Sequence, residues 1–205
     1  PVAMVARQPL VLAIHPSVPA TTVREFVEYT RTHAGTVNYG AGTSTFMLAA
    51  ELFKQHTGAD MQHIPFSGSG PTMTALLSGT IQAALISGAL TNATAQAGRI
   101  RVLAVSGASR LPPFAGVPTF AEAGVDGLDF PVWSAIFAPA GTPREVVDRL
   151  NAAIVRVLHS PSVRERFTAS AETIIASTPE ALAATVASES MRMKEIVARI
   201  GLAPR

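Results

Sequence analysis

Two glycine-rich turns, each set between a short apolar strand pattern and a helix, constrain the fold of this chain more than any other feature. Residues 37–87 follow the order strand, turn, helix, strand, turn, helix, strand. The first turn covers residues 39–45 (YGAGTST) and precedes a predicted helix over 46–56. The second covers residues 65–71 (PFSGSGP) and precedes a predicted helix over 72–78. Strands that alternate with helices predict an open, mostly parallel α/β sheet, with both turns at the carboxyl ends of its strands.

Both turns are suited to binding a negatively charged group. The first N–H groups of a helix have no partner within the helix, and the helix dipole favours negative charge there. Hydroxyl side chains beside those groups add further donors. The predicted ligand-binding residues of this stretch are Gly42, Thr43, Ser44, Thr45, Phe66, Ser67, Gly68, Ser69, Ser87 and Gly88. The alternative is a pair of small-residue turns that only cap two helices, with Phe66 in the core.

Composition and motif searches argue against several other functions. The absence of Cys excludes disulfides, cysteine-rich zinc sites and cysteine nucleophiles. The five His residues lack metal-ligand spacing, so no metal site is predicted. A net charge of +2 with scattered Arg residues argues against a nucleic-acid partner. No apolar run approaches the roughly 20 residues that a membrane-spanning helix needs.

Neither a cofactor nor a catalytic residue is predicted. Gly40 and Gly42 begin a dinucleotide fingerprint, but the third glycine and the acidic residue after the next strand are missing. A phosphate-binding Gly-Lys-Ser/Thr loop and a Gly-x-Ser-x-Gly elbow are both absent. The sequence nominates no base for Ser44 or Ser67 as a nucleophile.

The rest of the chain extends this pattern and then changes. The predicted strands cover residues 7–15, 37–39, 61–65, 81–86, 100–105, 132–137 and 173–176. The remaining predicted helices cover residues 23–33, 90–97, 119–123, 144–159, 163–169 and 179–200. Proline and glycine are concentrated in residues 107–131, which is typical of a connector. Trp133, the only Trp, is predicted as a further ligand-binding residue that lines a cleft, with a place in the core as the alternative.

Motifs spread over nearly the whole chain are similar to those of a known family. They are QPL at 8–10, HP at 15–16, VNY at 37–39, AELFK at 50–54, IPFxGxGP at 64–71, LLxG at 76–79, GRIRxLAVxG at 98–107, VPTFxEAG at 117–124 and FAPAGTP at 137–143. In this order and spacing they resemble the substrate-binding receptors of tripartite tricarboxylate transporters, the Bug or TctC family of periplasmic solute-binding proteins.

The resemblance implies a two-lobed type II periplasmic-binding-protein fold. Residues 1–128 would form the complete second lobe, and residues 129–205 the return strand and C-terminal helices of a partial first lobe. The family's first strand and the glycine-rich loop after it are expected to precede Pro1. Residues 2–6 contain no basic leader, so no signal peptide is recognised in them. The resemblance also implies a periplasmic receptor that captures a small organic carboxylate between its lobes and delivers it to membrane subunits of the transporter.

Two departures from the family pattern bear on the identity of the solute. Phe46 and Met47 replace a common His, and Gln82 stands where an Asp is frequent. Two other functions stay open. One is an orphan or truncated paralogue that senses a small metabolite or self-associates through its incomplete first lobe. The other is an α/β enzyme that acts on a carboxylated metabolite.

Overall fold

The chain divides into two compact units. The computed structural model describes residues 1–128, 130 and 132–201. The terminal unit combines Pro1–Gln8 with Val132–Arg205, and the central unit is Pro9–Pro131. The first eight residues were predicted to belong with the central part of the chain. They belong instead to the terminal unit, because they form a strand that pairs with strands of the C-terminal segment.

The predicted strand over residues 7–15 is two strands in two different sheets. β1 (Ala3–Gln8) lies in the terminal unit and β2 (Leu10–Ile14) in the central unit. Pro9 separates them and has no N–H to donate to a continuous ladder. Residues 7–15 (RQPLVLAIH) were predicted as a single strand, with no break at Pro9.

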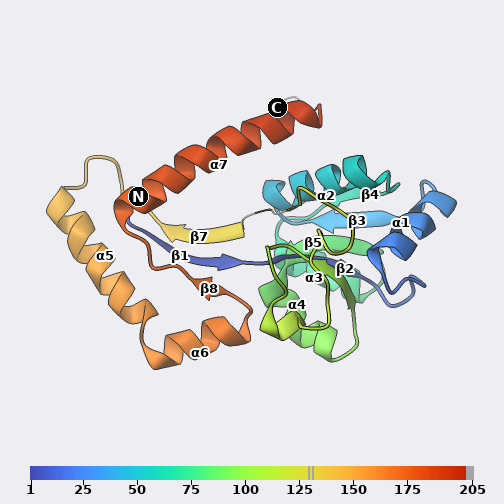
Figure 1. Ribbon diagram of the computed structural model, residues 1–205, viewed down its shortest axis with the longest axis horizontal. Coiled ribbons are helices and arrows are strands. Elements are labelled where there is room, and N and C mark those ends of the chain that lie inside the picture. The colour runs from blue at the N-terminus through green and yellow to red at the C-terminus, as the bar shows by residue number, and fades with distance from the viewer. Residues whose placement is uncertain (129, 131, 202–205) are drawn as a thin grey trace. The chain divides into compact units, whose positions relative to one another are not determined.

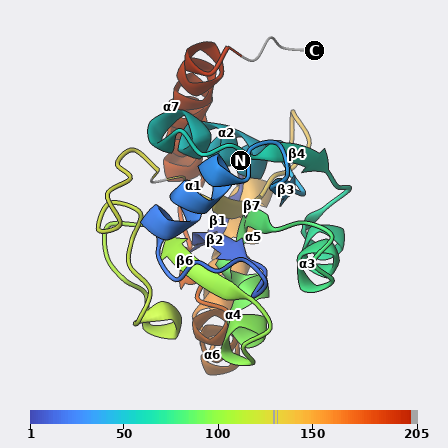
Figure 2. The same cartoon turned by 90° about the vertical axis from the view of Figure 1, so that its right-hand side faces the viewer.

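A five-stranded sheet in the order β4–β3–β5–β2–β6 forms the centre of the central unit (Figures 1 and 2). Its other strands are β3 (Asn38–Ala41), β4 (Gln62–Pro65), β5 (Ala83–Ser87) and β6 (Arg101–Val105). β3 pairs in parallel with β4 and β5, whereas β2 runs antiparallel to both of its neighbours. β3, β4, β5 and β6 therefore run in the same direction, as predicted for a mostly parallel sheet. β2 runs in the opposite direction between β5 and β6.

Helices cover both faces of this sheet. They are α1 (Val23–Thr32), α2 (Ser44–Thr57), α3 (Ser69–Leu77) and α4 (Gly88–Gln96). α1 and α2 lie on one face, and α3 and α4 lie on the other (Figure 2). Successive residues of β3 face opposite sides of the sheet. Tyr39 contacts α2 on one side, and Gly40 faces α3 on the other.

The helices after the two turns begin earlier than predicted, at Ser44 and Ser69. Pro71 is thus the third helical residue of α3, whereas it was expected at the first. Proline is tolerated there because the N–H groups of the first helical turn have no acceptor in the helix. The glycine-rich segments were predicted as turns up to residues 45 and 71. The carbonyls of Thr43 and Gly68 already accept the first helical hydrogen bonds.

The connector after β6 contains a 3₁₀ helix, η1 (Pro112–Phe114). The helix predicted over residues 119–123 is only a turn, because Thr119 forms a parallel bridge with Val105. Glu122 closes this turn: its Oε2 accepts from Thr119 N at 2.9 Å, and its N–H donates to Thr119 Oγ1 at 3.1 Å. Gly124 then follows with a φ of 82°, which ends the turn.

The terminal unit is a three-stranded sheet in the order β7–β1–β8 with three helices. Its further elements are β7 (Val132–Ile136), α5 (Arg144–Leu158), α6 (Pro161–Ala169), β8 (Thr173–Ile174) and α7 (Pro179–Arg199). β1 is antiparallel to both neighbours. Thr142 was expected to cap α5, but Pro143 holds that position, and the Thr142 hydroxyl donates to the Pro139 carbonyl at 2.8 Å.

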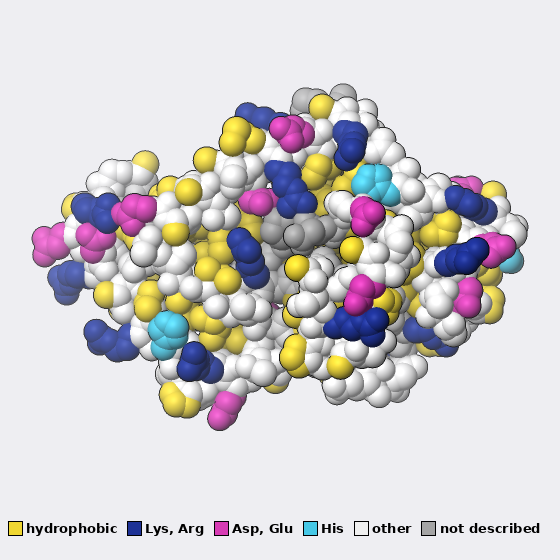
Figure 3. Space-filling view, viewed as in Figure 1, with side chains coloured by type: hydrophobic (Ala, Val, Ile, Leu, Met, Phe, Trp, Pro, Cys, Tyr) yellow, Lys and Arg dark blue, Asp and Glu magenta, His cyan; other side chains and the backbone are white. Residues whose placement is uncertain are grey.

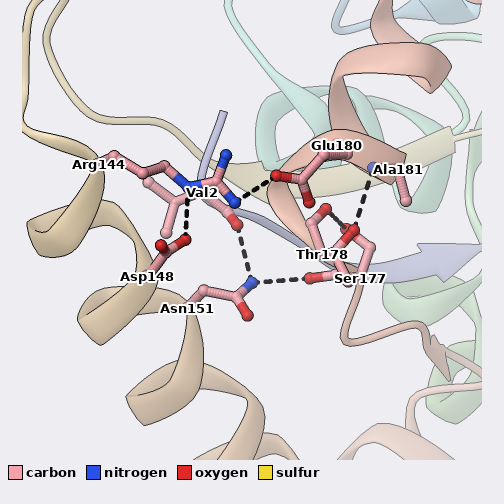
Figure 4. Close-up of polar contacts among 8 residues, drawn as sticks. All are labelled: Val2, Arg144, Asp148, Asn151, Ser177, Thr178, Glu180 and Ala181. Atoms are coloured by element: carbon pink, nitrogen blue, oxygen red, sulfur yellow. Dashed lines mark hydrogen bonds and ion pairs between the residues drawn. The ribbon is translucent and has the colours of Figure 1, made fainter.

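One amide side chain joins α5 to the residue before β1 and to the segment before α7. Asn151 Nδ2 donates to the Val2 carbonyl at 2.9 Å and to the Ser177 carbonyl at 2.8 Å (Figure 4). At the surface of the same unit, Arg144 pairs with Asp148 at 2.8 Å and with Glu180 at 2.5 Å. Acidic and basic side chains are interspersed over the face drawn in Figure 3. None of the helices in the described ranges is long and apolar enough to cross a bilayer.

Candidate anion-binding site

Three helix N-termini gather at one edge of the central sheet. β3, β4 and β5 are parallel neighbours, so their carboxyl ends share this edge. α2 begins three residues after β3 ends, α3 begins four residues after β4 ends, and α4 follows β5 directly. Each N-terminus brings backbone N–H groups and the positive end of a helix dipole to the same edge.

The first turn places two unpaired N–H groups and two hydroxyls at the start of α2. Thr43 is the N-cap, and its Oγ1 accepts from Phe46 N at 3.3 Å. Met47 is the first residue whose N–H donates within the helix, to the Thr43 carbonyl, so the N–H groups of Ser44 and Thr45 have no helical acceptor. Within the part of the chain that the structure describes, the Ser44 and Thr45 hydroxyls make no hydrogen bond either. These groups have no partner within the described protein, and their contact with a ligand stays a prediction.

The second turn has no side-chain cap. Gly68 is the N-cap of α3, and its carbonyl accepts from Thr72 N at 3.3 Å and Thr72 Oγ1 at 2.9 Å. The N–H groups of Ser69 and Gly70 follow the cap, whereas Pro71 has no N–H to offer. Ser67, which precedes the cap, is exposed. At the start of α3, two N–H groups therefore lack a side-chain acceptor, and an anion can accept their hydrogen bonds.

The backbones of the two turns are in direct contact. A Cβ built on Gly42 would lie 2.2 Å from the carbonyl carbon of Gly68 and 2.5 Å from Ser69 N. A Cβ on Gly40 would lie 2.8 Å from Thr72 Cγ2 and 3.0 Å from Phe66 Cε2. Phe66 therefore packs against β3, and the two turns form one continuous surface. The sequence predicted both turns at one sheet edge but gave no sign of this contact.

The third N-terminus is closed by the carbonyl of Pro9, the residue before β2. Gly88 is buried, and its N–H donates to the Pro9 carbonyl at 2.8 Å. Ser87 is 5% exposed and caps α4 by accepting from Ala89 N at 3.3 Å. Gly88 was predicted as a ligand-binding residue, and its N–H is engaged within the protein. Trp133, half-buried on β7, belongs to the terminal unit, and its assignment to a ligand site stays a prediction.

The two open turns contain no ionised side chain. Residues 34–50 and 64–98 include no Asp, Glu, Lys, Arg or His. A bound anion would therefore meet only the partial charges of N–H groups, hydroxyls and helix dipoles within these segments. Among the described residues, no cluster of His, Asp or Glu could hold a metal ion.

A polar cluster between β3, β4 and α2 lies next to the first turn. Tyr39 on β3 is completely buried, and its hydroxyl donates to Glu51 Oε1 on α2 at 2.6 Å. Lys54 Nζ lies 3.0 Å from the same carboxylate. The His63 ring on β4 stacks on Tyr39 with ring centroids 5.0 Å apart. This cluster joins β3, β4 and α2.

Burial shifts the pKa values of the two aromatic members of this cluster. The pKa of Tyr39 is raised well above its usual range, first by burial and then by its hydrogen bond to Glu51. The pKa of His63 is lowered, chiefly because burial disfavours the charged ring. Sequence reasoning missed the cluster because Tyr39 and His63 meet only through the parallel register of β3 and β4.

The fold is a partial type II periplasmic-binding-protein fold. The chain belongs to the family described as tripartite tricarboxylate transporter family receptor (TctC), whose profile matches residues 1–202. The family resemblance read from the sequence motifs is thereby confirmed.

Both sequence and structure comparisons agree on this family. Protein BugT of Bordetella pertussis is 32% identical over 203 residues, which are 98% of this chain and 62% of that protein. The structure of R. palustris Rpa4515 with adipate matches with a TM-score of 0.95 at 33% identity, over 100% of this chain and 69% of that one. MatC (Rpa3494) from Rhodopseudomonas palustris with bound malate matches with a TM-score of 0.91 at 29% identity, over 96% and 69%. The matches to curated relatives cover from 45% to 75% of their length, and 62% for BugT.

Proposed function

We propose that this chain is the carboxylate-binding part of a periplasmic receptor, with a small dicarboxylate as its ligand. The observation that carries the proposal is the contact between two helix N-termini, those of α2 and α3, whose first N–H groups are unpaired. Two relatives of known structure contain adipate and malate, and both ligands are dicarboxylates. The receptor would pass its ligand to the membrane subunits of a tripartite transporter, in keeping with the family description.

The proposed contacts are hydrogen bonds to one ligand carboxylate. The N–H groups of Ser44, Thr45, Ser69 and Gly70 donate to its oxygens, and the hydroxyls of Thr45 and Ser67 add further donors. Charge-assisted hydrogen bonds of this kind are shorter and stronger than neutral ones. Because no Lys or Arg side chain takes part in these segments, a neutral amide in place of the carboxylate would lose most of the attraction.

Thermal denaturation with and without ligand tests this function. A ligand at a hundred times its dissociation constant stabilises the folded protein by about 2.7 kcal/mol. For a chain of this size, that corresponds to a rise in Tm of about 5–10 °C. We expect this shift with malate or adipate and no shift with malamide or adipamide, the neutral diamides. Equal shifts with acids and amides, or no shift with either acid, would contradict the proposal.

We also infer binding without turnover, since the family is one of solute-binding receptors. Incubation of the protein with malate and with adipate, followed by NMR of the small molecules, tests this inference. The expected result is complete recovery of both acids. Conversion that depends on protein concentration would show an enzyme instead.

A further inference from the structure

The contact between the two turns depends on Gly42, which has no side chain. One Hα of Gly42 faces the peptide that joins Gly68 to Ser69. A Cβ in its place would lie 2.2 Å from the Gly68 carbonyl carbon, 2.5 Å from its oxygen and 2.5 Å from Ser69 N. Real Cβ atoms essentially never approach other atoms so closely. The obstructing atoms are backbone, so no side chain can rotate away to make room.

The peptide that Gly42 contacts is the one that starts α3. Gly68 is the N-cap of α3, and Ser69 supplies its first N–H group. Gly42 itself lies one residue before Thr43, the N-cap of α2. The distance between the two N-termini is therefore set at a point where each helix is about to begin.

We propose that Gly42 is a positioning residue, whose lack of a side chain holds the N–H groups of α2 and α3 close enough to bind the same carboxylate. This role rests on the proposed function, because it concerns how the two N-termini share a ligand. It assigns to Gly42 no contact with the ligand itself. A Cβ at this position would be directed at Gly68 and Ser69.

The backbone around Gly68 has its own restraint, which offers a second way to alter the spacing. Thr72 Oγ1 donates to the Gly68 carbonyl at 2.9 Å, in addition to the Thr72 N–H. Valine has nearly the shape of threonine but no hydroxyl. Thr72→Val would therefore release part of this restraint without adding an atom near Gly42.

The primary experiment compares Gly42→Ala with the wild type in two measurements. The first is the amide NMR spectrum of the ligand-free protein, in which the Ser69 and Gly70 resonances should move because the turns separate. The second is calorimetric titration with adipate and with malate, in which the affinity should fall at least tenfold. Thr72→Val should move the same resonances and lower the affinity by a smaller factor, which keeps the test decisive if Gly42→Ala does not fold.

Two control variants separate positioning from general loss of stability. Gly116→Ala makes the same chemical change in a turn where a Cβ would meet nothing within 4 Å. Ile14→Val removes a buried methyl group from β2 and should lower the Tm measurably. Both should keep the wild-type affinity at temperatures where they are folded.

Three results would overturn the positioning role. One is a folded Gly42→Ala protein whose affinity stays within twofold of the wild type. Another is a Gly42→Ala spectrum in which the Ser69 and Gly70 amide resonances stay at their wild-type positions. The third is a loss of affinity in Ile14→Val as large as that in Gly42→Ala. A wild type that binds neither acid would contradict the proposed function, while the ligand-free spectra would still decide whether Gly42 sets the spacing of the turns.

Discussion

Removing the Tyr39 hydroxyl tests whether the polar cluster holds α2 against the sheet. Tyr39→Phe keeps the buried ring and its stacking on His63, and deletes only the 2.6 Å hydrogen bond to Glu51. A hydrogen bond to a charged group contributes roughly 1.5–3 kcal/mol. Because the Glu51 side chain is 27% exposed and keeps Lys54 as a partner, we expect the lower end of this range, about 1.5 kcal/mol.

For a chain of this length, such a loss lowers Tm by about 3–6 °C. Urea and thermal denaturation, followed by circular dichroism, provide the measurement. Glu51→Gln and the double variant complete a mutant cycle, in which we expect a coupling of about 1 kcal/mol between the two side chains. Tyr29→Phe is the matched control, since Tyr29 is half-buried on α1 and its hydroxyl has no partner among the described residues. A Tyr39→Phe variant as stable as Tyr29→Phe, or an additive cycle, would refute the reasoning.

Three further changes test other parts of the structure. The lowered pKa of His63 means that its contribution to stability is complete above the unfolded pKa of about 6.5 and is lost as pH falls through the folded value. Tm should therefore fall less between pH 7.5 and 5 in His63→Phe than in the wild type, and parallel curves would contradict this. Asn151→Ala leaves the Val2 and Ser177 carbonyls without their donor and should lower the free energy of unfolding by about 1–3 kcal/mol, with Asn151→Asp at least as damaging. In Thr43→Asp the carboxylate still caps α2, so stability should be kept while binding of adipate is lost, whereas Thr43→Ala should cost about 1 kcal/mol. Tight adipate binding by Thr43→Asp would place the ligand elsewhere.

Local signals explain which elements of the central unit were predictable. Glycine-rich turns, a hydroxyl N-cap at Thr43 and short apolar strands act within a few residues, so β3, α2, β4 and α3 were all found in order. Helix starts were less accurate, because a helix can begin within a glycine-rich segment when the sheet edge supports it. The start of α3 inside the segment Gly68–Ser69–Gly70 is the example.

The sequence by itself determined the alternation of strands and helices, the uncharged segments around both turns and the family motifs. These properties depend on residue type and on neighbours along the chain. Only the tertiary structure decided that the strand predicted at residues 7–15 serves two sheets, that the Pro9 carbonyl closes the N-terminus of α4, and that Gly42 contacts Gly68. Each of these depends on which strands pair and in what register. Such pairing is fixed by hydrogen bonds and packing between residues far apart in the sequence, and a local pattern does not encode it.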